Sequence, residues 1–479
     1  MFTYSDLLRT SSIVAAALLE SRKDLQEERI AFAVTPGFAW VATQWGIWMA
    51  GGVAVPLPLD SPTPELEYFI GDSRASTVVC DASALPKLSV VAASCGIRSL
   101  TFADLCHRQT PELPDIGLSV RNDRRAMILY TSGTSNRPKG VVTTHANITA
   151  QIESLVNAWE WSADDRIVLC LPLHHVHGII NVVSCALWAG ATCEMLPRFD
   201  ANVVWDRLAS GGLTVFMAVP TIYTKLIAAW DAAPVERRKV LTNGCSRMRL
   251  MVSGSAALPV STLLRWKEIS GHTLLERYGM TEIGMALSNP LHGNRVPGSV
   301  GKPLPDVEVR LVAGDGKLVS SGTAGEIEVL GPGVFKEYWG RPEATRAAFR
   351  DGWFRTGDTA IIEDGIYRIL GRTSIDILKT GGHKTSALEI EEVLRHHPAV
   401  AECAVVGIPD AEWGERVGAA VVLHAGQILD LPSLRTWALK MLAPYKIPSR
   451  LLILDALPRN AMGKVVKPSV VELFKTKGE

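Results

Sequence analysis

The sequence has no excess charge of either sign, no closely paired cysteines and no long apolar run. Its 49 basic residues balance 49 acidic ones, so no overall field would draw the chain to nucleic acid or to an anionic membrane. The eight cysteines form no CxxC pair and no metal-type spacing, which favours a reducing compartment over a disulfide framework. No run approaches the roughly 20 apolar residues that a membrane-spanning helix needs. We therefore expect small-molecule ligands, no nucleic-acid partner and no stable membrane association.

One short apolar stretch lies near the N-terminus, from Ser12 to Leu19, between Arg9 and the basic segment 21–23. A secretory signal peptide would follow such a stretch with a small-residue cleavage site. Here the apolar part is short, no clear cleavage site follows it, and a helix-like pattern continues to Leu25. We therefore predict a cytoplasmic protein rather than a secreted one.

The length of 479 residues exceeds what one hydrophobic core usually serves, so at least two domains are expected. From the start to about residue 240, apolar strand-like runs alternate with longer amphipathic stretches, as in RIAFAVT, FAWVATQWGIWMAGG and VAVPLPL. This alternation is typical of parallel strands joined by helices. We therefore predict an α/β protein whose large N-terminal domain is built from layered α/β subdomains.

The pattern changes in the last third of the chain. Between about 296 and 370, short strand patterns with closely spaced Gly, Asp and Pro predict a small antiparallel or barrel-like β unit. After Arg372, a helix pattern at 386–395 and strand patterns at 403–407 and 418–423 predict a small α+β domain. We place the N-terminal domain at 1–371 and the C-terminal domain at 372–479.

A loop rich in hydroxyl groups, YTSGTSNRPKG at 130–140, follows an apolar strand pattern. It offers backbone N–H groups, hydroxyl side chains that include Thr131, Ser132 and Thr134, and Lys139 to a polyphosphate. It is not the P-loop of GTPases, because Lys139 lies six residues after Gly133 and is followed by Gly140. A polar surface turn is the alternative, and the attached Pro-Lys-Gly makes it the weaker one.

This loop closely resembles the signature of the ANL superfamily of adenylate-forming enzymes, which includes acyl-CoA synthetases, peptide-synthetase adenylation domains and luciferases. Further segments match the family in kind and in order: ERYGMTE at 276–282, DGWFRTGD at 351–358, GRTSIDILKTGG at 371–382 and PRNAMGK at 458–464. The resemblance covers nearly the whole chain. It implies an enzyme that uses ATP and Mg²⁺ to form an acyl-adenylate, then passes the acyl group to a thiol such as that of coenzyme A, with a mobile C-terminal domain.

The same resemblance implies which residues bind the nucleotide and its metal ion. Tyr278 would stack on adenine, Asp358 would accept hydrogen bonds from the ribose, and Arg372 would pair with phosphate or ribose. Glu282, together with Thr134, would hold Mg²⁺, a hard cation that keeps water and phosphate oxygens as its other ligands. The full set implied to hold ATP is Thr131, Ser132, Gly133, Thr134, Lys139, Gly254, Ser255, Ala256, Tyr278, Gly279, Met280, Asp358 and Arg372.

The residues implied in the chemical steps are Lys464, Glu282, Thr281 and His177. Lys464 resembles the family's catalytic lysine, which would stabilise charge that exists only in the adenylation transition state. The C-terminal domain would then rotate and present Lys379, Gly381 and Gly382 to a pantetheine arm. Asp376 lies four residues after Arg372, whereas the family's aspartate lies three after its arginine. We therefore name only 374–376 as the hinge region.

Two segments bear on the acid. LPLHHVHG at 171–178 borders the acyl pocket in the family, so His177 either faces the substrate or closes the channel. A zinc site there is disfavoured, because adjacent histidines do not easily share one metal and no Cys or acidic partner is suitably spaced. The segment 284–305 resembles malonyl-CoA synthetases, in which the arginine matching Arg295 pairs with the distal carboxylate of the substrate. The implied acyl-pocket residues are Arg295, His177, Ser255 and Met285.

Malonate, and with it methylmalonate, is therefore the predicted acid, since one methyl group typically changes binding by only about 1–3 kcal/mol. An exposed salt-bridging role for Arg295 is the alternative. Other hypotheses are a ligase for another small acid, an enzyme that loads a carrier protein, a luciferase-like oxygenase, and a nucleotide-binding regulator without catalysis. The regulator is disfavoured because Glu282, Arg372 and Lys464 are all present, and nothing specifically supports light emission.

Overall fold

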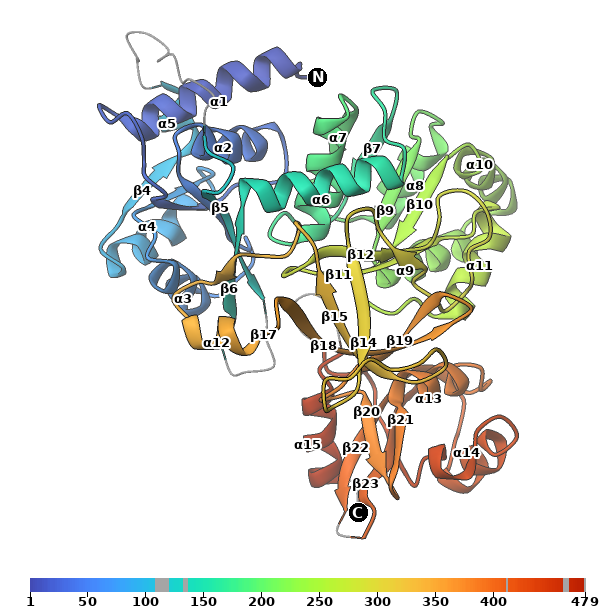
Figure 1. The fold of residues 1–479 in the computed structure, drawn as a ribbon. Coiled ribbons are helices and arrows are strands. Elements are labelled where there is room, and N and C mark those ends of the chain that lie inside the picture. Colours follow the sequence, from blue (N-terminus) through green and yellow to red (C-terminus); the bar gives the residue numbers. More distant parts are fainter. Residues whose placement is uncertain (108–119, 132–136, 411, 460–464, 478–479) are drawn as a thin grey trace.

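The structure is a computed structural model that describes residues 1–107, 120–131, 137–410, 412–459 and 465–477. Within these residues the strands form four sheets. Figure 1 shows two helix-covered sheets beside each other, a smaller β unit beneath them, and the C-terminal part at the far end. The predicted order of α/β subdomains, β unit and α+β domain is confirmed.

The first sheet has the strand order β16-β6-β5-β2-β1-β3-β4. Strands β1 to β5 pair in parallel, while β6 and β16 add an antiparallel edge. β2 and β3 are buried on both faces, as expected for parallel strands covered by helices. The strands are β1 (Arg29–Ala33), β2 (Val53–Pro56), β3 (Thr77–Cys80), β4 (Arg98–Thr101), β5 (Arg125–Thr131), β6 (Lys139–Thr144) and β16 (Glu337–Tyr338). The helices are α1 (Tyr4–Leu19), α2 (Phe38–Met49), α3 (Thr63–Ser73), α4 (Leu85–Ser94) and α5 (Phe102–His107).

The apolar stretch near the N-terminus forms the second half of α1 and packs on α2. A Cβ added to Gly46 would lie 2.5 Å from Val14 Cγ1, so only glycine lets the two helices approach this closely. Val14 and Leu18 are almost fully buried. The stretch therefore contributes to the core. No helix in the described ranges is long and apolar enough to cross a lipid bilayer.

The second sheet has the order β13-β12-β11-β10-β9-β7-β8, parallel from β8 to β11, with an antiparallel hairpin from β11 to β12. Its strands are β7 (Arg166–Leu169), β8 (Thr192–Met195), β9 (Val215–Ala218), β10 (Leu250–Ser253), β11 (Leu275–Met280), β12 (Gly284–Ser288) and β13 (Lys302–Pro303). Its helices are α6 (His145–Ala158), α7 (Cys185–Trp188), α8 (Ala201–Ala209), α9 (Pro220–Ala232), α10 (Val235–Cys245) and α11 (Val260–Ser270).

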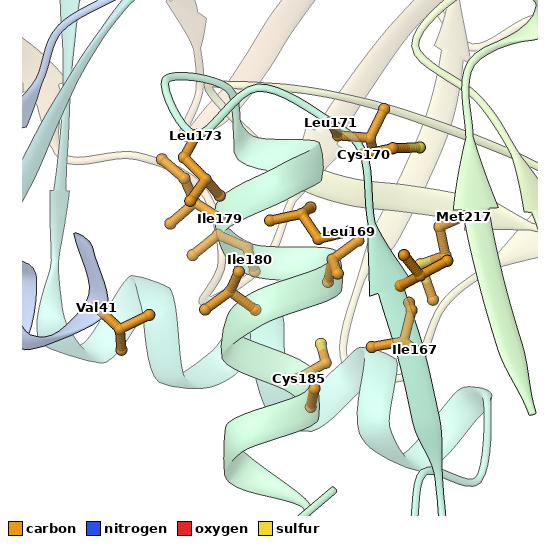
Figure 2. Packing of buried hydrophobic residues seen from close by; sticks show 14 of the residues in the cluster. Val41, Ile167, Leu169, Cys170, Leu171, Leu173, Ile179, Ile180, Cys185 and Met217 are labelled. Carbon is orange, nitrogen blue, oxygen red and sulfur yellow. The ribbon is translucent and has the colours of Figure 1, made fainter. Parts of the chain in front are cut away.

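A π-helix, η1 (His177–Ser184), follows β7 and continues into α7. The backbone N–H of Cys185 donates to the carbonyl of Ile180, five residues earlier. Figure 2 shows Ile179, Ile180 and Cys185 of this helical segment packed against Ile167 and Leu169 of β7. The π-helix is thus held by the core, and His177 is placed at its first residue. π-helical turns are rare and frequently occur at functional sites.

The predicted β unit is a five-stranded antiparallel sheet. Its strands are β14 (Glu308–Val312), β15 (Gly325–Leu330), β17 (Phe349–Arg350), β18 (Trp353–Glu363) and β19 (Ile366–Arg372), with α12 (Pro342–Ala347) beside them. It has its own hydrophobic cluster, which includes Phe335 and Phe354.

The C-terminal part has a fourth sheet of five strands. The predicted helix is α13, whose first turn is capped by Ser386, and the two predicted strands lie inside β22 and β23. Its strands are β20 (Ile377–Thr380), β21 (His383–Ser386), β22 (Val400–Asp410), β23 (Gly414–Leu423) and β24 (Arg450–Ile453). Its helices are α13 (Ala387–Leu394), α14 (Leu431–Ala438), the 3₁₀ turn η2 (Pro444–Lys446) and α15 (Lys467–Lys477).

Candidate active site

Three of the residues implied to bind the nucleotide lie in contact with one another. The Tyr278 hydroxyl donates to Asp358 Oδ2 at 2.5 Å, and Arg372 Nε lies 3.0 Å from Asp358 Oδ1. β18 and β19 set this geometry, because Asp358 and Arg372 are direct partners in their register. Burial and then the neighbouring Asp358 carboxylate raise the pKa of Tyr278 well above its ordinary value, so the phenol stays a neutral donor. The structure therefore brings Tyr278, Asp358 and Arg372 together.

Glu282 lies in the turn between β11 and β12, directly after Thr281, and is buried. The Tyr338 hydroxyl donates to Glu282 Oε1 at 2.9 Å, and Lys139 Nζ lies 4.9 Å from the centre of the Tyr338 ring. Burial raises the pKa of the Glu282 carboxyl. A lysine and a carboxylate from different sheets thus meet around one tyrosine.

The described residues contain no group of three or more His, Cys, Asp or Glu side chains that could hold a metal ion together. Glu282 would therefore be the main protein ligand of a cation that takes its remaining ligands from water and phosphate. Mg²⁺ is commonly bound in this way, through one or two carboxylates and the substrate phosphates. The donor set fits Mg²⁺ and does not fit a metal held entirely by the protein.

The predicted phosphate loop connects β5 to β6. Thr131, the last residue of β5, is the register partner of Lys139, the first residue of β6. Ser132, Gly133 and Thr134 lie outside the described residues, as does Lys464. The two described ends of the loop therefore lie side by side, with Lys139 near Tyr338 and Glu282.

A second polar cluster lies where β10 ends beside β11. Arg277 is 3% exposed, and its Nη2 donates to Ser255 Oγ at 3.4 Å. Ser255 Oγ lies 3.2 Å from His177 Nδ1. A Cβ on Gly254 would lie 2.6 Å from Arg277 Cζ, so only glycine fits there. Ser255 itself has a φ of 70°, a left-handed conformation that is strained for a residue with a side chain. The backbone here is therefore shaped around the guanidinium.

The donor and the acceptor can be assigned for each hydrogen bond of this cluster. A guanidinium only donates, so Ser255 Oγ accepts from Arg277 and its own hydrogen points to His177 Nδ1. His177 must then carry its proton on Nε2, because burial, and then the nearby Arg277 charge, lower its pKa well below the ordinary value and keep the ring neutral. His177 Nε2 and Arg277 Nε are both buried with no hydrogen-bond partner among the residues described. The cluster thus presents two unused donors.

Arg277 also has no carboxylate partner in the described part of the chain, and burial lowers its pKa to about 9. A buried charge without a partner is costly, so such a group usually has a ligand. Unused donors beside a cation fit an anion such as a carboxylate. Arg277 was not predicted as a site residue from the sequence; its only signal was its place, beside Glu276, in the strand pattern LLERYGM.

Arg295, predicted to bind the distal carboxylate, lies elsewhere. Its guanidinium donates to the carbonyl oxygens of Thr273 at 2.6 Å, Leu291 at 2.7 Å and Pro290 at 3.0 Å. Thr273 precedes the amino end of β11, whereas Glu282 follows its carboxyl end, roughly 20 Å away at about 3.3 Å per strand residue. The β11–β12 hairpin carries the chain back to that opposite edge. In this structure Arg295 holds the loop after β12 in place, and its role at the distal carboxylate stays a prediction. Among the described residues, the partners of its guanidinium are carbonyl oxygens and not the carboxylate that a salt bridge would need.

Other predicted residues are placed as follows. Met285 is buried and pairs in register with Gly279, where a Cβ would lie 2.1 Å from the carbonyl of Gly284. Met280 ends β11 and Ala256 is exposed. Gly381 and Gly382, with φ of 55° and 80°, form the turn between β20 and β21. The Lys379 backbone N–H donates to Glu415 at 2.6 Å. The glycine turn is thus built on the C-terminal sheet.

Comparison with known proteins gives one consistent result. Residues 1–339 match the model of the AMP-binding enzyme family, and residues 389–464 match that of the AMP-binding enzyme C-terminal domain. The chain is 48% identical to the mitochondrial malonate–CoA ligase ACSF3 of Bos taurus, over 98% of this chain and 86% of that protein.

Two crystal structures of MatB from Rhodopseudomonas palustris, each 37% identical in sequence, share the fold. The ATP-bound form has a TM-score of 0.91, over 98% of this chain and 93% of that chain. The apo form has a TM-score of 0.80, over 99% and 94%. The chain therefore belongs to the AMP-binding enzyme family, in the adenylate-forming superfamily that includes acyl-CoA synthetases.

Proposed function

We propose that this protein ligates malonate to coenzyme A in two steps. Malonate attacks the α-phosphate of ATP, giving malonyl-adenylate and pyrophosphate. The CoA thiol then attacks the acyl carbon, giving malonyl-CoA and releasing AMP. The similarity to malonate–CoA ligase ACSF3 supports this reaction, and the buried Arg277 is the single structural observation that carries the choice of acid.

Arg277 would bind the carboxylate of malonate that does not react. Its Nε–H and the His177 Nε2–H are the donors of this cluster that have no acceptor among the described residues, and together they would bind one carboxylate in a largely desolvated site. A monocarboxylic acid would leave both donors unpaired, which typically costs about 1–3 kcal/mol for each buried polar group. We therefore assign the distal-carboxylate role to Arg277 in place of Arg295, with His177 as a substrate-facing residue.

Adenylation brings a carboxylate to a polyphosphate, so the repulsion between anions must be offset. Lys139 would contact the phosphates. Glu282 would hold Mg²⁺, which when bound supplies positive charge to the phosphate oxygens. Tyr278, Asp358 and Arg372 would hold the nucleoside. Lys464, which lies outside the described residues, would stabilise charge on the α-phosphate and the attacking carboxylate.

For the second step, the C-terminal domain 372–479 would rotate about 374–376. β19 ends in the third sheet at Arg372 and β20 begins the fourth at Ile377, so few residues need to change conformation. The turn at Gly381 and Gly382 would then approach the pantetheine arm.

The test measures AMP release with malonate, methylmalonate, succinate, acetate, octanoate and benzoate, for the wild type, Arg277→Met and Arg295→Met. We expect Arg277→Met to lower kcat/KM for malonate by about 100-fold, because removing one partner of a buried charge pair costs about 2–5 kcal/mol. Activity with acetate should change by less than about fivefold. Arg295→Met should keep the malonate preference.

Thermal unfolding is the control for folding. Arg277→Met removes an unpaired buried charge, so the free protein should be no less stable than the wild type. An equal loss with malonate and acetate would contradict the role of Arg277. A preference for a monocarboxylic acid in the wild type would contradict the choice of malonate and leave a ligase for another small acid. Turnover with a carrier-protein thiol but not with CoA would show that the acyl group is passed to a carrier protein and not to CoA.

For the location, all eight cysteines, each in the described part, are free thiols, which is typical of a reducing compartment and supports a cytoplasmic protein. The ACSF3 relative is, by its name, a mitochondrial protein. Imaging of the tagged full chain in its own cells decides between the two.

A further inference from the structure

A buried lysine that the proposed mechanism does not use lies at the start of α15. The Lys467 side chain is 11% exposed, and its Nζ lies 2.5 Å from Asp376 Oδ1 and 2.7 Å from Glu391 Oε1. Burial opposes the charge, but the two carboxylates raise the pKa of Lys467, so the ammonium is retained. Two acidic residues far apart in sequence are thus joined through one cation.

Asp376 connects this cation to the nucleotide residues. Its Oδ2 accepts from the backbone N–H of Arg372 at 2.9 Å, and its own backbone N–H donates to the carbonyl of Arg372 at 2.7 Å. A Cβ on Gly371 would lie 2.3 Å from Asp376 Cβ, so the approach depends on glycine. The Arg372 side chain in turn contacts Asp358. A continuous set of contacts therefore runs from Asp358 to Lys467.

Glu391 connects the same cation to the body of the C-terminal domain. Its Oε1 accepts from the backbone N–H of Val405 in β22 at 2.8 Å, and its Oε2 lies 3.2 Å from Arg395 Nη2. Lys467 thus lies between the proposed hinge and the C-terminal sheet, and fixes each relative to the other.

We infer that Lys467 is a positioning residue for adenylation, because it clamps the hinge region to the C-terminal domain in the arrangement that this step needs. The inference rests on the proposed two-step function. Lys467 follows the predicted catalytic residue Lys464 by three residues in the sequence, so loss of its ion pairs is expected to affect the step that uses Lys464. The TM-score of 0.91 with ATP-bound MatB, against 0.80 with apo MatB, supports this assignment to adenylation.

The test compares Lys467→Met with Lys475→Met, a matched control on the same helix whose lysine forms an exposed pair with Glu472. Malonate-dependent exchange of pyrophosphate into ATP measures adenylation. Thioester formation from supplied malonyl-adenylate and CoA measures the second step. We expect Lys467→Met to lower the first rate at least tenfold and the second less than threefold, while Lys475→Met leaves both unchanged.

Asp376→Asn keeps the shape of the side chain and leaves the ammonium paired with Glu391, so it carries the test should Lys467→Met fail to fold. It should produce the same selective loss of adenylation. Equal losses in both steps, or no loss in either, would overturn the clamp and indicate a purely structural ion pair. Absence of both steps in the wild type would instead refute the proposed function.

Discussion

The polar side chains on the two sides of strand β11 differ in whether they have hydrogen-bond partners. On the nucleotide side, Tyr278, Asp358 and Arg372 satisfy one another, and Glu282 has Tyr338. On the acyl side, donors on Arg277 and His177 have no acceptor in the described structure. Side chains that bond to one another are held in place before a ligand binds. Donors without an acceptor indicate that the ligand must bring an acceptor, here a negatively charged one. The acyl side is therefore the more informative about the substrate.

The largest effect that would sharpen this contrast is expected for Glu282→Gln. Glutamine can still accept from Tyr338 but carries no charge for Mg²⁺, so adenylation should fall by about 100-fold or more with every acid. Pyrophosphate exchange measured across a range of Mg²⁺ concentrations checks this. An unchanged Mg²⁺ dependence would remove Glu282 from the metal site.

A smaller and equally uniform effect is expected for Asp358→Asn. The amide loses the charge that faces Arg372 and one acceptor for the ribose, and hydrogen bonds to charged groups are typically worth about 1.5–3 kcal/mol. The KM for ATP should rise by about 10- to 100-fold, by the same factor with malonate and with acetate. If the increase in the KM for ATP depended on the acid, nucleotide binding and acid binding on the two sides of β11 would not be independent.

Arg295→Met should act on stability instead of substrate choice. It leaves three carbonyl groups without their donor at a half-buried site, so the free energy of unfolding should fall by about 1–2 kcal/mol. The midpoint of urea unfolding reports this loss, and the ratio of malonate to acetate activity should stay that of the wild type. A lost preference for malonate would restore the original assignment of Arg295.

The last effect is expected on the pH dependence of stability, for Glu276→Gln. Burial, together with the nearby Glu392, raises the pKa of Glu276 to about 8. The folded pKa exceeds the unfolded value, so this contribution to stability is complete below about pH 4.5 and is lost as the pH rises through about 8. The loss is at most about 1.4 kcal/mol per pH unit for one proton. Unfolding midpoints between pH 5 and 9 should fall less steeply in the variant; equal slopes would contradict a protonated Glu276.

The nucleotide residues could be predicted from sequence because each lies in a motif whose order along the chain is itself informative. Tyr278, Asp358 and Arg372 were named in this way, and the structure brings them together. For Arg295 the sequence provided less guidance, because a loop arginine offers no local sign of its partners. Only the return of the β11–β12 hairpin shows that it lies at the other edge of the sheet.

Arg277 could not be chosen from sequence for a related reason. Alternation along a strand tells which residues share a face, but not what lies opposite that face. Arg277 contacts Ser255, which lies 22 residues earlier in the chain, and through Ser255 it is linked to His177, which lies 100 residues earlier. In the fold, the alternating apolar runs predicted the parallel strands well. The π-helix was not predicted, because the pattern of apolar residues does not show whether each N–H donates to the carbonyl four or five residues earlier.

That π-helix places one residue more beside His177 than an α-helical turn would hold. A π-helix closes its hydrogen bonds five residues back instead of four, so η1 holds more chain than its length requires. Removing one residue between Gly178 and Val183 would let the segment return to α-helical bonding and turn His177 relative to α7, with β7 left in place. Each single-residue deletion in this segment would therefore rotate His177 about the helix axis and should change which acid the enzyme prefers. If no deletion changed the preference among acids, His177 would not contact the substrate.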